Sequence, residues 1–298
     1  MIWDSIEGRD VRGVTIEEWG GSGYSLAALD AVLGDDWTVV PLIKVGRDLS
    51  AKATRFLRDL KCVRPEARFI EVPEANPRVR LVYDQEGRRC EGLTGGVPPW
   101  SWAELGPMVL GLDAVYANFI TGYETDLATM RALRQAFRGP IYGDIHSLAL
   151  GRREDGVRYY RPVEEALGWL TAFDFAQVNE DEMTQLGPQP LELATRALAN
   201  GSRAVIVTLA ERGAVYFAAA ESGLVKTQRI APEGGPVSGD PTGCGDVFGA
   251  TCFASLLNGL GIKAAIAEAN RMARKNVSYH GATGLQRHLV GAIQKVSL

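Results

Sequence analysis

The chain has 298 residues, of which 46% are hydrophobic and 23% are charged, and its formal net charge is −4. A nearly balanced charge gives no electrostatic reason to expect nucleic acid or an anionic membrane as a partner, because both favour a basic surface. The four cysteines form no CxxC pair and the three histidines are far apart, which argues against a disulfide framework and a structural zinc site.

The N-terminus lacks the basic start and apolar core of a signal peptide. No apolar run approaches the roughly 20 residues that a membrane-spanning helix needs. Free thiols fit a reducing compartment. We therefore expect a cytoplasmic protein whose partner is a small molecule rather than a membrane or a nucleic acid.

Short β-branched runs alternate with helical patterns along most of the chain. Strands are predicted at 37–45, 113–120, 141–145, 173–178 and 203–209, and helices at 48–59, 124–137, 162–171 and twice within 180–200. After residue 243 the pattern is helical, with helices predicted at 243–259, 262–279 and 285–293. Such alternation is typical of an α/β fold with a mostly parallel central sheet flanked by helices, here as a single domain over residues 1–298.

Two stretches, 13–21 and 67–93, interrupt this alternation. Polar and apolar residues alternate in both stretches, and Glu86-Gly87 is a candidate turn in the second. These features indicate antiparallel strands. We expect them to form a small β-sheet lid, made by about 8–20 and 66–96 and inserted into the α/β body. The alternative is that these strands extend the main sheet.

The predicted lid would carry apolar side chains on an exposed face, namely Ile16, Trp19, Leu81 and Tyr83. Exposed apolar patches often mark an interface. We therefore expect a homodimer that forms through the lid.

The run with the clearest chemistry is 239–250, in which a turn and three small residues precede an Asp and an apolar helix. The first N–H groups of a helix lack intrahelical partners and lie at the positive end of its dipole. The backbone of Gly243, Cys244 and Gly245 is thus a candidate anion hole for phosphate. Asp246 could accept a proton from an attacking hydroxyl, although a plain helix cap explains the same residues equally well.

Other nucleotide-binding signals are absent from the sequence. It contains no GxxxxGK[ST], which disfavours a P-loop kinase, and no GxGxxG between a strand and a helix, which disfavours a dinucleotide-dependent oxidoreductase.

The run 240–250 resembles the C-terminal signature of the ribokinase-like (PfkB) carbohydrate kinases. Four further segments match in the order of that family: Trp19–Gly23, Lys44–Asp48, Asn179–Glu182 and 205–217. The resemblance covers essentially the whole chain. It implies a ribokinase-like fold and transfer of the γ-phosphoryl group of ATP to a hydroxyl of a sugar or sugar-like molecule. The same fold also serves nucleoside kinases, and a catalytically weak ligand-binding relative is a further alternative.

The resemblance implies a role for individual residues. Asp246 would be the base, and the backbone of Gly243, Cys244 and Gly245 would stabilise the transferring phosphoryl group. The remaining candidates are Asp4, Gly20, Gly21, Asn118 and Asp144 for the substrate; Asn179, Thr208, Gly213 and Asn270 for the nucleotide; Glu182 for Mg²⁺, through water; and Asp240 and Thr242 for a monovalent cation such as K⁺, with help from the loop around Gly281. His146 follows Asp144, but a lone His is more often structural and is left out.

The sequence departs from the family pattern at several positions. Cys244 replaces an Ala, Ser25 an Asn that would contact substrate, and Ala210 a Gly near the nucleotide. Ile2-Trp3-Asp4 is interpreted as the remnant of the family's first central strand. A chain extended upstream is accordingly expected to be more stable.

Overall fold

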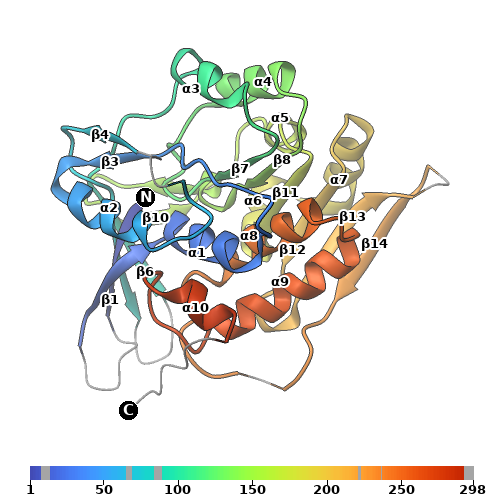
Figure 1. Cartoon of the computed structure of the whole chain (residues 1–298). Coiled ribbons are helices and arrows are strands. Elements are labelled where there is room, and N and C mark those ends of the chain that lie inside the picture. The colour runs from blue at the N-terminus through green and yellow to red at the C-terminus, as the bar shows by residue number, and fades with distance from the viewer. Residues whose placement is uncertain (8–13, 65–68, 84–88, 221–222, 236, 292–298) are drawn as a thin grey trace. The chain divides into compact units, whose positions relative to one another are not determined.

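The computed structural model describes residues 1–7, 14–64, 69–83, 89–220, 223–235 and 237–291 (Figure 1). The chain divides into two compact units. Unit 1 comprises Met1–Pro98, Arg152–Arg158 and Glu233–Leu298, and unit 2 comprises Pro99–Gly151 and Tyr159–Pro232. That residues 1–298 form one domain stays a prediction. Within the described ranges, no helix is long and apolar enough to cross a membrane, and the cytoplasmic location stays a prediction.

Unit 2 is built on a six-stranded sheet in the order β14-β13-β12-β11-β8-β7 (Figure 1). Neighbouring strands from β7 to β12 run parallel, and β13 and β14 join antiparallel. This sheet confirms the predicted mostly parallel architecture. The strands are β7 (Val115–Asn118), β8 (Ile141–Asp144), β11 (Phe175–Asn179), β12 (Ala204–Thr208), β13 (Ala214–Ala219) and β14 (Val225–Ile230).

The helices of unit 2 connect these strands and pack on them. They are α3 (Trp102–Val109), α4 (Leu127–Ala136), α5 (Ala166–Thr171), α6 (Glu180–Leu186) and α7 (Pro190–Ala199). Helix α6 packs against β11 and β12, and α7 against β12 and β13.

A short hairpin of β9 (Leu150–Arg152) and β10 (Arg158–Tyr160) forms a separate two-stranded sheet that was not predicted. At the sheet centre the Tyr142 ring stacks between Tyr116 and Phe175, with centroids 5.5 and 6.2 Å away.

Unit 1 contains a four-stranded sheet in the order β2-β1-β5-β6 and a two-stranded sheet of β3 and β4. The four-stranded sheet agrees with the small additional sheet that the sequence predicted. The strands are β1 (Ile2–Glu7), β2 (Ile16–Gly20), β3 (Lys44–Gly46), β4 (Ile70–Val72), β5 (Arg78–Tyr83) and β6 (Arg89–Thr94). The helices are α1 (Ser22–Val32), α2 (Ser50–Arg58), α8 (Cys244–Leu257), α9 (Ile262–Asn276) and α10 (Leu285–Leu289).

Two strand predictions need correction. The run 37–45 was expected to be one buried strand, but only Lys44–Gly46 forms a strand, and Val39 makes an isolated bridge. Pro41 explains the break, because proline offers no N–H to a sheet. The segment Ile2-Trp3-Asp4 is not in the six-stranded sheet; it lies in β1, between β2 and β5.

The predicted exposed apolar face of the small sheet is wrong. Trp19, Leu81 and Tyr83 are 2%, 4% and 9% exposed, and Ile16 is half-buried. The Trp19 ring packs on the core residue Phe56, with centroids 6.3 Å apart.

The outward side chains of β5 are charged instead. Arg80 pairs with Glu7 at 2.8 Å and Arg78 with Asp48 at 2.7 Å. The observation that suggested a dimer through this sheet is therefore lost. Residues 8–13, 66–68 and the Glu86-Gly87 turn of the predicted lid lie outside the described residues.

Candidate active site

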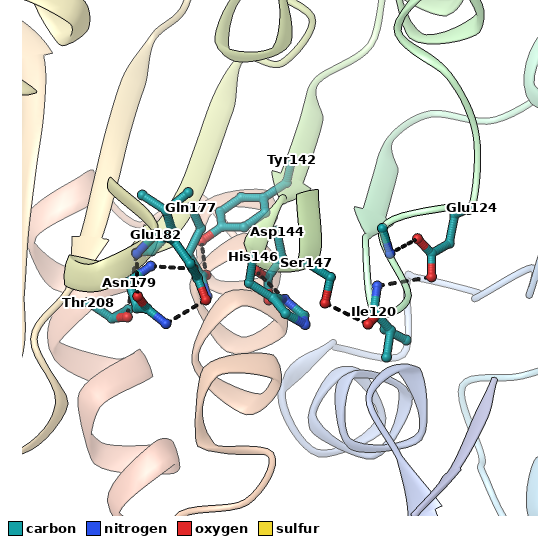
Figure 2. Close-up of polar contacts among 12 residues, drawn as sticks. Ile120, Glu124, Tyr142, Asp144, His146, Ser147, Gln177, Asn179, Glu182 and Thr208 are labelled. Carbon is teal, nitrogen blue, oxygen red and sulfur yellow. Dashed lines mark hydrogen bonds and ion pairs between the residues drawn. The ribbon is translucent and has the colours of Figure 1, made fainter. Parts of the chain in front are cut away.

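Four predicted site residues stand at the last position of four neighbouring parallel strands in unit 2. Asn118 ends β7, Asp144 ends β8, Asn179 ends β11 and Thr208 ends β12. The strand register pairs Asn118 with Asp144, and Asn179 with Thr208. Figure 2 shows Asp144, Asn179 and Thr208 along this edge. The predicted positions at the ends of strands thus agree with the structure. The carboxyl edge of an open α/β sheet is where such folds bind ligands, and the binding roles of these residues stay predictions.

The Asp144 carboxylate is the most buried acid of this edge, at 1% exposure. Its Oδ1 lies 3.0 Å from Nδ1 of His146 (Figure 2). Its Oδ2 is buried and has no hydrogen-bond partner among the described residues. Buried polar atoms are normally satisfied, so an acceptor left open here fits a ligand hydroxyl. His146, which the sequence prediction left out, thus orients Asp144; the Asp-Ile-His spacing directly after a strand was the available signal.

Glu124 shapes the loop after β7, and sequence reasoning missed it. Its Oε1 accepts hydrogen bonds from Ile120 N at 3.0 Å and Thr121 N at 2.6 Å, and its Oε2 from Gly122 N at 3.0 Å. One carboxylate therefore satisfies three successive backbone donors, and Figure 2 shows Glu124 beside Ile120. Ser147 joins the same loop by donating to Ile120 O at 2.6 Å. These bonds fix the chain that follows Asn118.

Asn179 and Glu182 form a reciprocal capping box at the start of α6. Asn179 Oδ1 accepts from Glu182 N at 2.9 Å, and Glu182 Oε2 accepts from Asn179 N at 2.7 Å. Asn179 Nδ2 donates to the other oxygen, Oε1. Glu182 is 5% exposed. Because both carboxylate oxygens are engaged, direct coordination of Mg²⁺ would compete with the cap, and only action through water fits these residues.

The segment after β12 reverses the chain through a short 3₁₀ turn, Ala210–Arg212, which Gly213 ends. Leu209 N closes it by donating to Gly213 O at 2.7 Å. Ala210 has φ of 51°, a left-handed conformation that costs a non-glycine residue roughly 1–2 kcal/mol. The structure thus gives a physical reason for the glycine that the family pattern has here.

Replacing this residue should stabilise the protein. Ala210→Gly relieves the left-handed strain but adds chain entropy to the unfolded state, so we expect a net gain of about 0.5–1 kcal/mol in the free energy of unfolding. Ala267→Gly, at an exposed position inside α9, is the matched control and should lose a similar amount. Urea unfolding of both variants checks this, and a loss for Ala210→Gly would contradict it.

In unit 1, the turn before α8 is held by Gly243, whose φ of 76° is left-handed. A Cβ at this position would lie 2.4 Å from ring atoms of Tyr24, so conformation and space both require glycine. Cys244 N donates to Pro241 O at 3.1 Å. This bond takes one N–H out of the predicted anion hole. The Gly243 N–H has no hydrogen-bond partner among the described residues.

The Cys244 side chain ties the turn to α9. Its thiol donates to Ala273 O at 3.3 Å and accepts from Asn276 Nδ2 at 3.4 Å. Burial raises the pKa of the Cys244 thiol to about 11, so the side chain is a protonated packing group at neutral pH. Asn276, which is fully buried, also donates to Thr242 O at 2.8 Å.

Asp240 is the most buried acid of the turn, at 2% exposure. Its Oδ1 accepts from Thr242 N at 2.9 Å and from Thr242 Oγ1 at 2.6 Å. Its Oδ2 lies 3.2 Å from Nδ1 of His280. Since both oxygens have protein partners, a monovalent cation would have to share them, and these residues fit the predicted cation only in part.

Tyr24 lies at the centre of this cluster, although sequence reasoning did not single it out. Its side chain is 1% exposed. Burial, followed by the charges of Asp4, Asp240 and Asp246, raises the pKa of the Tyr24 hydroxyl well above its usual value, while a hydrogen bond from the Gly281 backbone opposes this. Three separately predicted carboxylates therefore act electrostatically on one hydroxyl. The available signal was a large aromatic residue inside a run of small ones, Gly20 to Ser25.

Asp4 and Gly20 are in direct contact. A Cβ on Gly20 would lie 1.9 Å from Asp4 Oδ2, so only glycine admits the carboxylate here. Asp4 is 6% exposed within β1, and Gly21 directly precedes α1 as its N-cap. Asn270 is buried on α9, at 7% exposure, and is not a solvated helix residue. The predicted substrate residues at the N-terminus thus meet at the cluster that contains Asp246.

A model of the pfkB family of carbohydrate kinases matches residues 157–288. Fructoselysine 6-kinase of Escherichia coli (strain K12) is 33% identical over 190 residues, which cover 57% of this chain and 66% of that protein, just under two thirds of its length. Residues 157–288 belong to the pfkB family of carbohydrate kinases. The matched range includes Asp246 and Asn179, so the family assignment rests on residues of both units.

The fold of this chain is also similar to that of solved structures of ribokinase-family proteins. A pyrophosphate-dependent kinase in the ribokinase family matches with a TM-score of 0.77 at 18% identity, over 98% of this chain and 96% of that one. Ribokinase from Thermotoga maritima matches with a TM-score of 0.69 at 15% identity, over 97% and 93%. At these identities the likeness is one of fold, and it confirms the predicted ribokinase-like class.

Proposed function

We propose that this protein transfers the γ-phosphoryl group of ATP to a hydroxyl of a sugar or sugar-like small molecule. The observation that carries the proposal is the position of Asp246, in the first turn of α8 and three residues after the left-handed N-cap Gly243. A carboxylate beside helix N–H groups can take a proton where a phosphoryl group is held.

The proposed chemistry follows from the residues of unit 1. The substrate hydroxyl attacks the γ-phosphorus, its proton passes to the Asp246 carboxylate, and ADP leaves. The N-terminus of α8 and the Gly243 N–H offset charge on the phosphoryl oxygens. Asp4 and the backbone at Gly20 and Gly21 would hold other hydroxyls of the substrate. Tyr24, buried among the three acids, would fix the distance between Asp4 and the turn.

The residues at the strand ends of unit 2 supply the remaining proposed roles. Asp144, with one oxygen oriented by His146 and the other open, would accept a hydrogen bond from a substrate hydroxyl, and Asn118 would assist. The residues proposed to contact the nucleotide are Asn179, Thr208, Gly213 and Asn270. Mg²⁺ bound with the nucleotide would neutralise phosphate charge. Glu182 would reach it only through water, because its oxygens cap α6.

A substrate and donor screen tests the proposal. ATP and pyrophosphate would each be offered with fructoselysine, ribose, myo-inositol and inosine, and phosphorylated product would be detected by ³¹P NMR. Fructoselysine is included because the 33% identical relative is a fructoselysine 6-kinase. Pyrophosphate is included because a kinase with a similar fold is pyrophosphate-dependent. We expect product from ATP with a sugar or sugar-like acceptor. Product from inosine alone would favour the nucleoside kinase, and binding without turnover would favour a catalytically weak relative.

Potassium is expected to raise the rate if Asp240 and Thr242 help to hold a monovalent cation. Ordering of that turn would position the adjacent Gly243 and Asp246. Initial rates in potassium, sodium and a bulky organic cation check this, with ionic strength held equal. Equal rates in all three would show that His280 and Thr242 alone satisfy Asp240.

Dimerisation stays a prediction, now without the apolar face that suggested it. Light scattering at micromolar concentration checks it, and a monomeric mass would contradict it.

A further inference from the structure

A pocket of ≈ 580 Å³ opens on unit 1, and its lining contains none of the residues predicted for the kinase site. Its lining side chains come from β1, from β2, from α2 with its C-cap Asp59, from the segment before α10 and from α10 itself. Pockets of 300–1,000 Å³ are the usual size for small-molecule ligands.

The inner wall of the pocket is aromatic. Trp3 and Trp19 make an edge-to-face pair with centroids 5.1 Å apart, and Phe56 packs on Trp19. Trp3 is 7% exposed, and its indole Nε1 is a buried donor with no hydrogen-bond partner among the described residues. A buried donor left open is costly unless a ligand or water accepts its hydrogen bond.

The rim of the pocket carries excess positive charge from α2. Lys52 Nζ lies 3.9 Å from the centroid of the Trp3 ring. Arg55 and Arg58 are exposed, and neither has an ion pair with any described residue. Spacings of three and four place Lys52, Arg55 and Asp59 along one face of the helix end.

The acidic side chains of the rim are already engaged. Asp59 pairs with Arg287 at 2.9 Å, and Glu18 accepts from Thr283 Oγ1 at 2.7 Å and from Trp19 N at 2.8 Å. With Asp59 and Arg287 cancelling, three cations face one carboxylate, an excess of two positive charges. The guanidinium groups of Arg55 and Arg58 therefore remain available to a ligand, beside the small parts of Trp3, Trp19 and Phe56 that line the pocket.

We propose that this pocket binds a small anion that carries a flat aromatic ring. The ring lies against the tryptophan wall, where edge-to-face and offset contacts are favourable. The acidic group meets Arg55 and Arg58, whose planar guanidinium groups suit bidentate binding of phosphate or carboxylate. A neutral aromatic compound would lack the second contact and a bare anion the first.

Titration of the full chain with phenyl phosphate tests the proposal, with tryptophan fluorescence and calorimetry as readouts. We expect saturable binding, and binding of benzyl alcohol and of inorganic phosphate that is weaker by about tenfold or more. The double variant Arg55→Gln/Arg58→Gln should also lose about tenfold or more in affinity for phenyl phosphate. Arg64→Gln, an exposed arginine of the same unit outside the pocket, is the matched control and should change nothing.

The variants also separate this pocket from the phosphate site at α8. Phenyl phosphate bound at α8 would not sense Arg55 or Arg58, so an affinity unchanged in the double variant would overturn the proposal. Absence of saturable binding to the wild type, or equal binding of benzyl alcohol, would overturn it as well. Trp3→Phe keeps the ring but removes the open N–H, and a reduced affinity in this variant would support the assigned wall. All variants would be checked for native circular dichroism.

Discussion

Asp246→Asn is expected to lower kcat by about 10²–10⁴-fold, because general-base catalysis contributes a rate enhancement of that size. The KM for ATP should stay nearly unchanged, because the proposed phosphate contacts come from the backbone. Asparagine has the size of aspartate and most of its hydrogen bonds, but it cannot accept the proton of the attacking hydroxyl. Steady-state kinetics with the acceptor found in the screen would measure the change.

A matched variant separates catalysis from capping. Asp126 is a true N-cap, since its side chain accepts from Thr129 N at 2.7 Å at the start of α4. Asn caps a helix as well as Asp, so Asp126→Asn should leave kcat unaltered. If Asp246 were only a cap, Asp246→Asn would behave in the same way. Near-wild-type turnover by Asp246→Asn, in a preparation free of host kinases, would overturn the proposed mechanism.

The ends of the strands were predictable because the pattern of apolar residues that marks a strand lies within a few neighbouring positions of the sequence. The runs at 141–145, 173–178 and 203–209 each lie within two residues of the observed strands, and parallel strands bring their carboxyl ends to one edge. Asp144, Asn179 and Thr208 therefore reach the same edge of the sheet. The turn at Gly243 was predictable for a similar reason. A run of small residues directly before an apolar helix indicates a tight turn at the helix N-terminus, and this signal lies within a few neighbouring positions.

Residues whose roles depend on distant contacts were not predictable. Tyr24 faces acids from β1, from the turn before α8 and from α8 itself, and no spacing within one segment encodes that meeting. Glu124 turns back on the loop before it, which a pattern of hydrophobicity cannot reveal. The apolar face of the small sheet was misjudged because it depends on strand register and tertiary packing. Trp19 pairs with Trp3 and Leu81 with Ile6, which lie on opposite faces of β1, and both side chains are buried.

Gly243→Ala should destabilise the protein and abolish most of its activity. A left-handed alanine costs roughly 1–2 kcal/mol, and forcing a methyl group against the Tyr24 ring adds about 1–3 kcal/mol of overpacking. The turn can relieve this strain only by moving, which would displace the N–H groups and Asp246 that depend on it. Thermal unfolding and kcat/KM would both be measured. Gly34→Ala, outside the proposed site, is the matched control, because its Cβ would meet nothing within 4 Å and its φ is not left-handed.

A double-mutant cycle with Tyr24→Ala identifies the cause. Removing the ring is itself costly, since truncation of a buried aromatic side chain loses about 3–5 kcal/mol. If the Tyr24 ring is what excludes a side chain at position 243, the double variant should lose less unfolding free energy than the sum of the two single losses. In the double variant, the methyl group at position 243 meets no ring. Additive losses would assign the whole effect of Gly243→Ala to backbone conformation. A Gly243→Ala protein as stable and active as Gly34→Ala would instead show that the turn adapts, and that Tyr24 does not hold Gly243 and Asp246 in place.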